Sequence, residues 1–105
     1  MGFTVFPYSP PNWPELQITS YVCLDIFNPL FIRRNLHDVS KYDMTVNFKI
    51  YKSKADRIAN PSVSIENFSL NLSEVDLSSN LSLLSYVHAK ERFSQIESVV
   101  LTDDV

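Results

Sequence analysis

Only one glycine occurs among the 105 residues, at position 2. Glycine-rich phosphate sites need a backbone without Cβ at several fixed positions, so the chain holds neither a P-loop nor a dinucleotide-binding fingerprint. Hydrophobic residues make up 45% of the chain and charged residues 20%, which is typical of a globular protein. A chain of this length can bury a core without disulfides or a metal. We therefore expect one small folded domain.

The charge balance argues against nucleic acid as a partner. Nine Lys and Arg residues against twelve Asp and Glu residues give a net charge of −3, and affinity for nucleic acid comes mostly from neutralising phosphates. The densest basic and aromatic cluster is Tyr51, Lys52, Lys54 and Arg57, with acidic residues scattered around it. We expect no nucleic-acid binding.

Cysteine and histidine are too few for the common kinds of metal site. Cys23 is the only cysteine, so it has no partner for an internal disulfide, and His37 and His88 are the only histidines. Structural zinc usually needs four ligands in paired spacings, which this chain does not offer. Cys23 falls within a predicted strand, where a small thiol usually packs as an apolar group. We expect no metal site and no Cys–His nucleophile.

Two carboxylate pairs, Glu74 with Asp76 and Asp103 with Asp104, are the remaining candidates for acid–base chemistry. Such catalysis needs carboxylates in a cleft, with pKa values pushed apart. These residues lie among serines or in a predicted tail, so we interpret them as solvated. We expect no catalytic residues, no cofactor and no small-molecule substrate, and the chain is predicted not to be an enzyme.

Residues 1–16 differ in composition from the rest of the chain. Proline fixes φ and biases the preceding residue toward extended geometry, so we expect an extended arm, either folded over its own core or laid on a neighbouring subunit. Aromatic side chains often dominate protein interfaces. Four of the six prolines and four aromatics, the candidate partner-interface residues, lie here: Pro7, Pro10, Pro11 and Pro14, with Phe3, Phe6, Tyr8 and Trp13. The segment has no basic start or long apolar run, so we expect neither a signal peptide nor membrane insertion.

Residues 17–105 are predicted to form the single domain. Apolar and polar residues alternate over residues 17–27, 30–37, 44–51 and, less regularly, 63–72, as expected for half-buried strands. Ser53 followed by Asp56 has the form of a capping box, which predicts a short helix over residues 54–59 that ends at Asn60-Pro61.

The last third of the chain changes to a helical period. We expect an amphipathic helix over residues 81–93, capped by Asn80 or Ser79, then a short edge strand over 96–101 and an exposed tail over 102–105. The predicted helix stripe is Leu77, Leu81, Leu84 and His88. The fold class is α+β: a small antiparallel sheet or sandwich, a short helix and a C-terminal amphipathic helix. The predicted core is Val22, Leu24, Ile26, Val46, Phe48, Ile50, Leu81 and Leu84.

One stretch is similar to a known group of proteins. Residues 46–57, VNFKIYKSKADR, are followed by Asn60-Pro61. This resembles small proteins encoded in the structural-gene regions of tailed bacteriophages, with a strand ending in an aromatic and a serine, a short Ala-x-Arg helix, a proline and another strand. Their C-terminal pattern matches Tyr86, Lys90, Phe93 and Asp104-Val105.

The resemblance covers about residues 44–105. It departs from the group at Asn60, where glycine is common, and residues 1–16 have no counterpart. It implies a virion protein made in the host cytoplasm, whose partners are other copies of itself and other virion proteins. We expect a non-enzymatic structural component of the tail, baseplate, neck or capsid. The alternatives are a small soluble cellular adaptor or protein-binding module and, third, an enzyme that uses no cofactor.

Overall fold

The computed structural model describes residues 2–10, 15, 17–96 and 99–104, and within these it contains six strands and two helices. The α+β class is confirmed, with an antiparallel sheet and a helix near the C-terminus. The elements are β1 (Gly2–Tyr8), β2 (Ile18–Leu24), β3 (Leu30–Arg34), β4 (Tyr42–Tyr51), α1 (Lys54–Ala59), β5 (Glu66–Val75), α2 (Leu81–Ser94) and β6 (Val100–Asp104).

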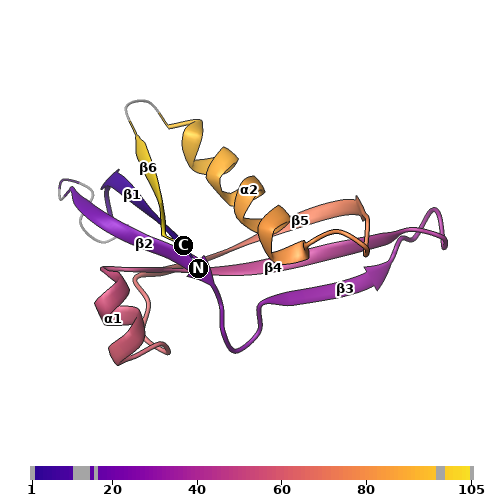
Figure 1. Ribbon diagram of the computed structural model, residues 1–105, viewed down its shortest axis with the longest axis horizontal. Helices are drawn as coiled ribbons and strands as arrows, with labels where there is room; N and C mark the ends of the chain where they lie inside the picture. The colour runs from indigo at the N-terminus through magenta and orange to yellow at the C-terminus, as the bar shows by residue number, and fades with distance from the viewer. Residues whose placement is uncertain (1, 11–14, 16, 97–98, 105) are drawn as a thin grey trace.

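The long strand β4 organises the sheet. Along one edge its first half pairs with β3 and its second half with β2, while β5 pairs along nearly the whole opposite edge. β2 continues the sheet to β1 and then to β6, and all of these pairings are antiparallel. Figure 1 shows α2 lying across one face of this sheet and α1 packed beneath the other.

The main core lies between the sheet and α2. Alternate residues of β4 point to this side and are fully buried: Met44, Val46, Phe48 and Ile50. The predicted core residues Val22, Val46, Phe48 and Ile50 are thus confirmed, and Leu24 and Leu81 are partly buried against them. Leu84 is half-buried. Ile26 was predicted wrongly: it follows the end of β2 and is 48% exposed.

The buried face of α2 also differs from the prediction. The buried residues of α2 are Ser85, Tyr86, Ala89 and Phe93, whereas the predicted Leu81, Leu84 and His88 are only half-buried. Small and aromatic side chains, and not leucines, therefore make up the face of α2 that is buried against the sheet. The predicted stripe consisted mainly of leucines, and one of them, Leu77, lies before the start of the helix.

The predicted N-terminal arm is a strand of the sheet over its first half. Gly2–Tyr8 pair with β2 on one side and with β6 on the other, with an irregularity between Val5 and Tyr8 where Pro7 lies. The edge strand predicted over 96–101 is β6 (Val100–Asp104), so Thr102 and Asp103, which were predicted to lie in a tail, are exposed but paired with β1. Lys90 Nζ in α2 lies 2.9 Å from Asp103 Oδ1 and ties the helix to this strand. β1 and β6 are thus paired although they lie at opposite ends of the chain.

Both predicted helix starts are confirmed. Ser53 Oγ accepts a hydrogen bond from Asp56 N at 3.1 Å, and Asn80 Oδ1 accepts one from Leu83 N at 3.0 Å. These bonds satisfy backbone N–H groups that have no partner inside the first turn of a helix.

Candidate functional site

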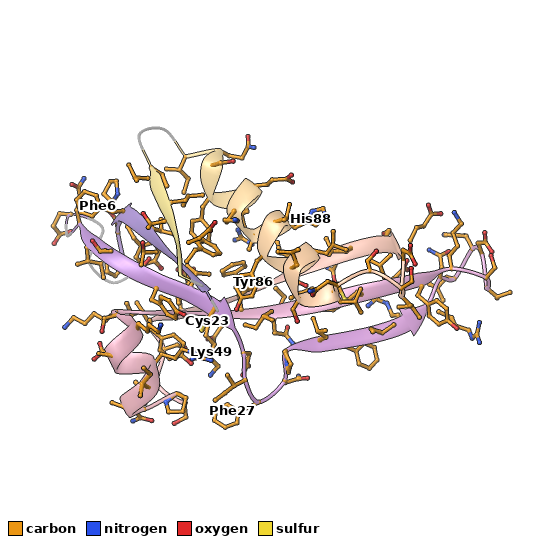
Figure 2. The ribbon with its side chains drawn as sticks, in the orientation of Figure 1. Phe6, Cys23, Phe27, Lys49, Tyr86 and His88 are labelled. Carbon is orange, nitrogen blue, oxygen red and sulfur yellow. The ribbon has the colours of Figure 1, made fainter. Side chains whose placement is uncertain are left out.

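The aromatics predicted as a partner interface are not one surface. Phe3 is fully buried in the main core, with ring centroids 6.3 Å from Tyr86 and 5.8 Å from Phe93 in edge-to-face geometry. Phe3 therefore holds its own domain together, which corrects its expected role at an interface. Phe6 is 48% exposed (Figure 2) and remains available to a partner. Trp13 lies outside the described residues.

Tyr8 closes one end of the core. Its hydroxyl donates a hydrogen bond to Glu66 Oε2 on β5, and the two residues line a cavity of about 300 Å³. Burial, followed by the bond to Glu66 and its negative charge, raises the pKa of Tyr8 well above its usual value. The guanidinium carbon of Arg92 lies 4.5 Å from the centroid of Phe68 at the same cavity. The remaining lining residues are Ile50, Phe93 and Ile96.

This cavity brings together a tyrosine, a carboxylate and a guanidinium from β1, β5 and α2, and no pattern along the chain links these three residues. The Tyr8 proton is held by Glu66, so the tyrosine acts as a donor and not as a base. The Glu66 carboxylate accepts this hydrogen bond from Tyr8. The arrangement clasps β1 to β5 and stabilises the sheet.

Cys23 and the two histidines lie apart. Cys23 is fully buried on the face of the sheet that α1 covers, packed with Tyr21 and Tyr51. Burial raises the pKa of the thiol, although Arg57 opposes the shift, and a protonated buried thiol is a poor nucleophile. His88 lies on α2 beyond the opposite face, with Nδ1 3.8 Å from Glu91 (Figure 2), and His37 lies in the loop after β3.

Two further findings concern the part of the chain that the structure describes. No group of three or more His, Cys, Asp and Glu side chains there is arranged to hold a metal ion. No helix there is both long enough and apolar enough to span a membrane.

The most distinctive surface is a projection that we call the tongue: β3, the loop of residues 35–41 and the first half of β4. In Figure 1 its tip extends beyond both helices. The molecule measures 46 × 31 × 27 Å, and its radius of gyration of 14.7 Å exceeds the value of about 13 Å for a compact domain of this length. Four large apolar side chains of the tongue are exposed, namely Phe31 (58%), Ile32 (40%), Leu36 (93%) and Val39 (71%), whereas Met44 and Val46 of β4 are buried in the main core.

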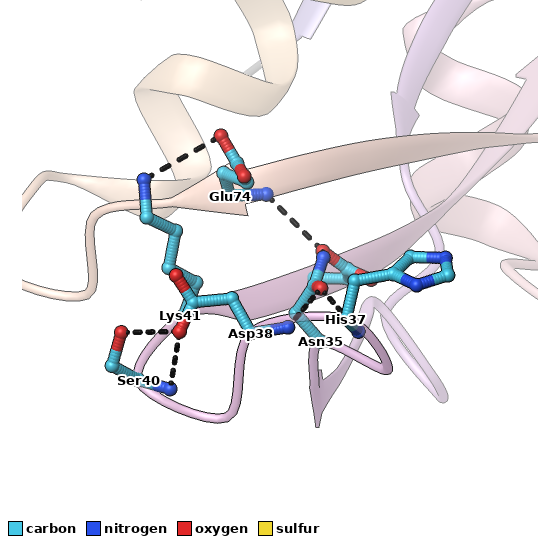
Figure 3. A network of polar contacts seen from close by, with 7 residues as sticks. Asn35, His37, Asp38, Ser40, Lys41 and Glu74 are labelled. Carbon is cyan, nitrogen blue, oxygen red and sulfur yellow. Dashed lines mark hydrogen bonds and ion pairs between the residues drawn. The ribbon is translucent and has the colours of Figure 1, made fainter.

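The loop at the tip of the tongue is held by its own polar side chains (Figure 3). Asn35 Oδ1 accepts hydrogen bonds from the backbone N–H groups of His37 and Asp38 at 2.8 and 2.9 Å. Asp38 Oδ1 in turn accepts from Ser40 N and Ser40 Oγ at 3.0 and 2.6 Å. The loop is therefore preformed, and it presents Leu36 and Val39 to solvent without needing a partner to order it.

A second set of bonds fixes the base of this loop to β5. Asp43 Oδ1 accepts from Asn35 Nδ2 at 2.9 Å and from Glu74 N at 3.1 Å, and these two bonds lower the pKa of Asp43. Lys41 Nζ lies 3.6 Å from Glu74 Oε2. The tongue is thus a rigid extension of the sheet.

Sequence reasoning missed the tongue as a surface, although a signal was present. Phe31 and Ile32 are consecutive, so they point to opposite faces of the sheet, and Leu36 and Val39 follow in a polar loop. Large apolar residues on both faces of a short strand indicate either burial on both sides or exposure of at least one side.

No protein-family model matches the chain, and no curated protein or solved structure matches it.

Proposed function

We propose that this protein is a non-enzymatic assembly component that acts through protein–protein contacts made by its tongue. The setting that we propose is the particle of a tailed bacteriophage, at its tail, baseplate, neck or capsid. Support for that setting comes from the resemblance of residues 44–105 to small proteins of phage structural-gene regions.

The tongue carries this proposal. Isolated exposed apolar residues are normal, but here four large ones lie on one rigid projection of about seventeen residues. Leu36, at 93% exposed, is the extreme case. A preformed apolar projection loses little conformational entropy when it docks, which favours binding.

The buried groups support a non-catalytic role. The Cys23 thiol is covered by α1, and the Tyr8 hydroxyl is held by Glu66. Neither group combines access to solvent with an adjacent free base, as nucleophilic or general-base catalysis requires.

The proposal is tested by the double variant Leu36→Ser, Val39→Ser. The matched control is Val63→Ser, since Val63 is also exposed, at 62%, but lies in the loop between α1 and β5. Mass spectrometry of density-purified particles from infected cells measures incorporation. We expect the wild type and the control in many copies per particle, and the tongue variant as a folded protein left in the free fraction.

Two results would contradict the proposal. Incorporation of the tongue variant at the wild-type level would show that the exposed apolar residues of the tongue are not needed for assembly. Recovery of the wild type only as a free cytosolic monomer would favour a cellular adaptor instead.

A further inference from the structure

β3 is an open edge of the sheet. Among the described residues it pairs only with β4, so its other side carries backbone groups without a strand partner. Such an edge is a template for pairing with another chain. We propose that a second copy of this protein adds to β3 in antiparallel orientation, with Ile32 facing Ile32 of the second copy across a two-fold axis. This inference rests on the proposed function and names one of its subunit contacts.

The hydrogen bonds to β4 identify which residues of β3 face outward. Asn47 N donates to Pro29 O and Asn35 N to Lys41 O, both at 2.9 Å, and each bond joins directly opposed residues of the two strands. In an antiparallel ladder, residues alternate between bonding inward and bonding outward. Residues 29, 31, 33 and 35 therefore bond toward β4, and the backbone N–H and C=O groups of Leu30, Ile32 and Arg34 point to the open edge.

A two-fold axis at Ile32 satisfies all of these outward groups together. Ile32 then exchanges both of its backbone bonds with Ile32 of the second copy, and Leu30 exchanges both with Arg34 of the second copy. Any register shifted with the same bonding phase places at least one of the three residues opposite a residue that lies outside β3. The open edge of β3 is thus self-complementary about its central residue.

The side chains fit the same register. Phe31 falls opposite Arg33 of the second copy in a non-hydrogen-bonded pair, in which side chains approach most closely. The aliphatic stem of Arg33 can then cover the Phe31 ring, which is 58% exposed in the single chain. Arg34 falls opposite Leu30, so no arginine directly opposes an arginine.

The exposed apolar residues at the two ends of β3 also become complementary. An antiparallel pairing brings the loop after β3 of one copy beside the loop before β3 of the other. The first loop carries Leu36 (93% exposed), and the second carries Ile26 (48%) and Phe27 (65%). Contacts of this kind occur twice in an isologous dimer, the most common symmetric assembly. This is why we assign the edge to a second copy and not to an unrelated chain.

The two-fold position of Ile32 permits a charge-swap test. Ile32→Lys and Ile32→Glu each place two like charges directly opposite each other, which destabilises a strand pair. An equal mixture of the two variants places opposite charges there instead. The matched controls are Val63→Lys and Val63→Glu, at an exposed position in the loop between α1 and β5. Sedimentation equilibrium measures the dimer dissociation constant, and circular dichroism checks that each variant is folded.

We expect a wild-type dimer, at least about tenfold weaker dimerisation for each Ile32 variant alone, and recovery in their mixture. The Val63 variants should dimerise as the wild type does. Hydrogen exchange gives a second readout, because dimer formation should protect the amides of Leu30, Ile32 and Arg34 while leaving Phe31 and Arg33, already bonded to β4, unchanged.

A wild type that stays monomeric at hundreds of micromolar overturns the inference. So does a dimer whose three outward amides exchange at the same rate at low and high protein concentration, or a mixture that fails to recover although each variant is folded. A monomeric protein that still enters particles through its tongue overturns only this pairing. An Ile32-dependent dimer that is absent from particles overturns only the proposed function.

Discussion

Gly2 lies where β1 has no room for a side chain. A Cβ built there would lie 2.5 Å from Tyr21 Oη and 2.7 Å from the backbone oxygen of Val22. The tyrosine can shift, but Val22 O belongs to the paired strand β2 and cannot move without disturbing the ladder. We expect Gly2→Ala to lower the free energy of unfolding by about 1–3 kcal/mol, as overpacking does. Urea denaturation measures this, and an unchanged midpoint would contradict so close an approach.

Glu74 has a backbone conformation that glycine adopts at lower energy. Its φ of 55° lies in the left-handed region, at the register shift where β5 carries one more residue than β4. The left-handed conformation costs an L-residue roughly 1–2 kcal/mol. We expect Glu74→Gly to raise the free energy of unfolding by about 0.5–1 kcal/mol and Glu74→Val to lower it by a similar amount.

The two Glu74 variants control for each other, since both remove the exposed contact with Lys41. The sign of their difference in thermal or urea stability therefore reports the backbone conformation, because in an extended strand valine would be the more stable of the two. Equal stability of the glycine and valine variants would contradict a left-handed residue at position 74.

At the scale of the elements, β1 is an interior strand and not an appendage. Phe3 and Val5 are buried in the main core, and β1 separates β2 from β6. We expect deletion of residues 1–8 to abolish cooperative unfolding, because it removes two core side chains and leaves β6 without its partner. Phe6→Ser is the control, since Phe6 is 48% exposed and its loss should leave a cooperative transition. A cooperative melt of the deleted chain would restore the arm interpretation.

The elements that the sequence predicts well are those whose signal is local. The alternation in β2 and β4 and the caps at Ser53 and Asn80 are written in neighbouring residues, and the structure confirms them. β1 was predicted as an arm, and the C-terminal edge strand was placed over 96–101 and not over 100–104, because the pairing of β1 with β6 joins residues about 100 positions apart and the prolines near β1 favour an arm locally. No local pattern reports such a pairing.

The same distinction between local signals and long-range pairing applies to the candidate surfaces. Aromatic residues near the N-terminus suggested an interface, but exposure depends on pairing, and Phe3 is buried because β1 joins the sheet. The clasp between Tyr8 and Glu66 joins β1 to β5, which β2 and β4 separate in the sheet, so spacing along the chain could not reveal it. The exposed tongue was within reach of the sequence, through the consecutive apolar residues of β3.

At the scale of the whole molecule, the stability of the tongue and that of the rest of the domain, which we call the body, are expected to respond to pH in opposite directions. Hydrogen bonds from Ser40 lower the pKa of Asp38, and bonds from Asn35 and Glu74 lower that of Asp43, each from a usual value of 3.8. Both carboxylates lie in the tongue. In the body, burial raises the pKa of Tyr8 and of Tyr86 above the usual 10.0, and a backbone bond from Leu24 only partly opposes the shift at Tyr86.

A carboxylate whose pKa is lower in the folded state stabilises that state above its unfolded pKa, and the stabilisation is lost as pH falls. We therefore expect the tongue to loosen first below about pH 4, with faster exchange of the Glu74 amide while the core amides of β4 stay protected. A tyrosine whose pKa is raised by burial stabilises the folded state below its unfolded pKa, so above about pH 10 the body should lose stability instead. Hydrogen exchange followed by NMR across this range measures the tongue and the body separately.

Asp43→Asn, which can still accept the bond from Glu74 N, should weaken the acid response of the tongue and leave the alkaline response of the body unchanged. Simultaneous loss of protection at both ends in acid would show that the tongue and body unfold as one unit and would contradict this division.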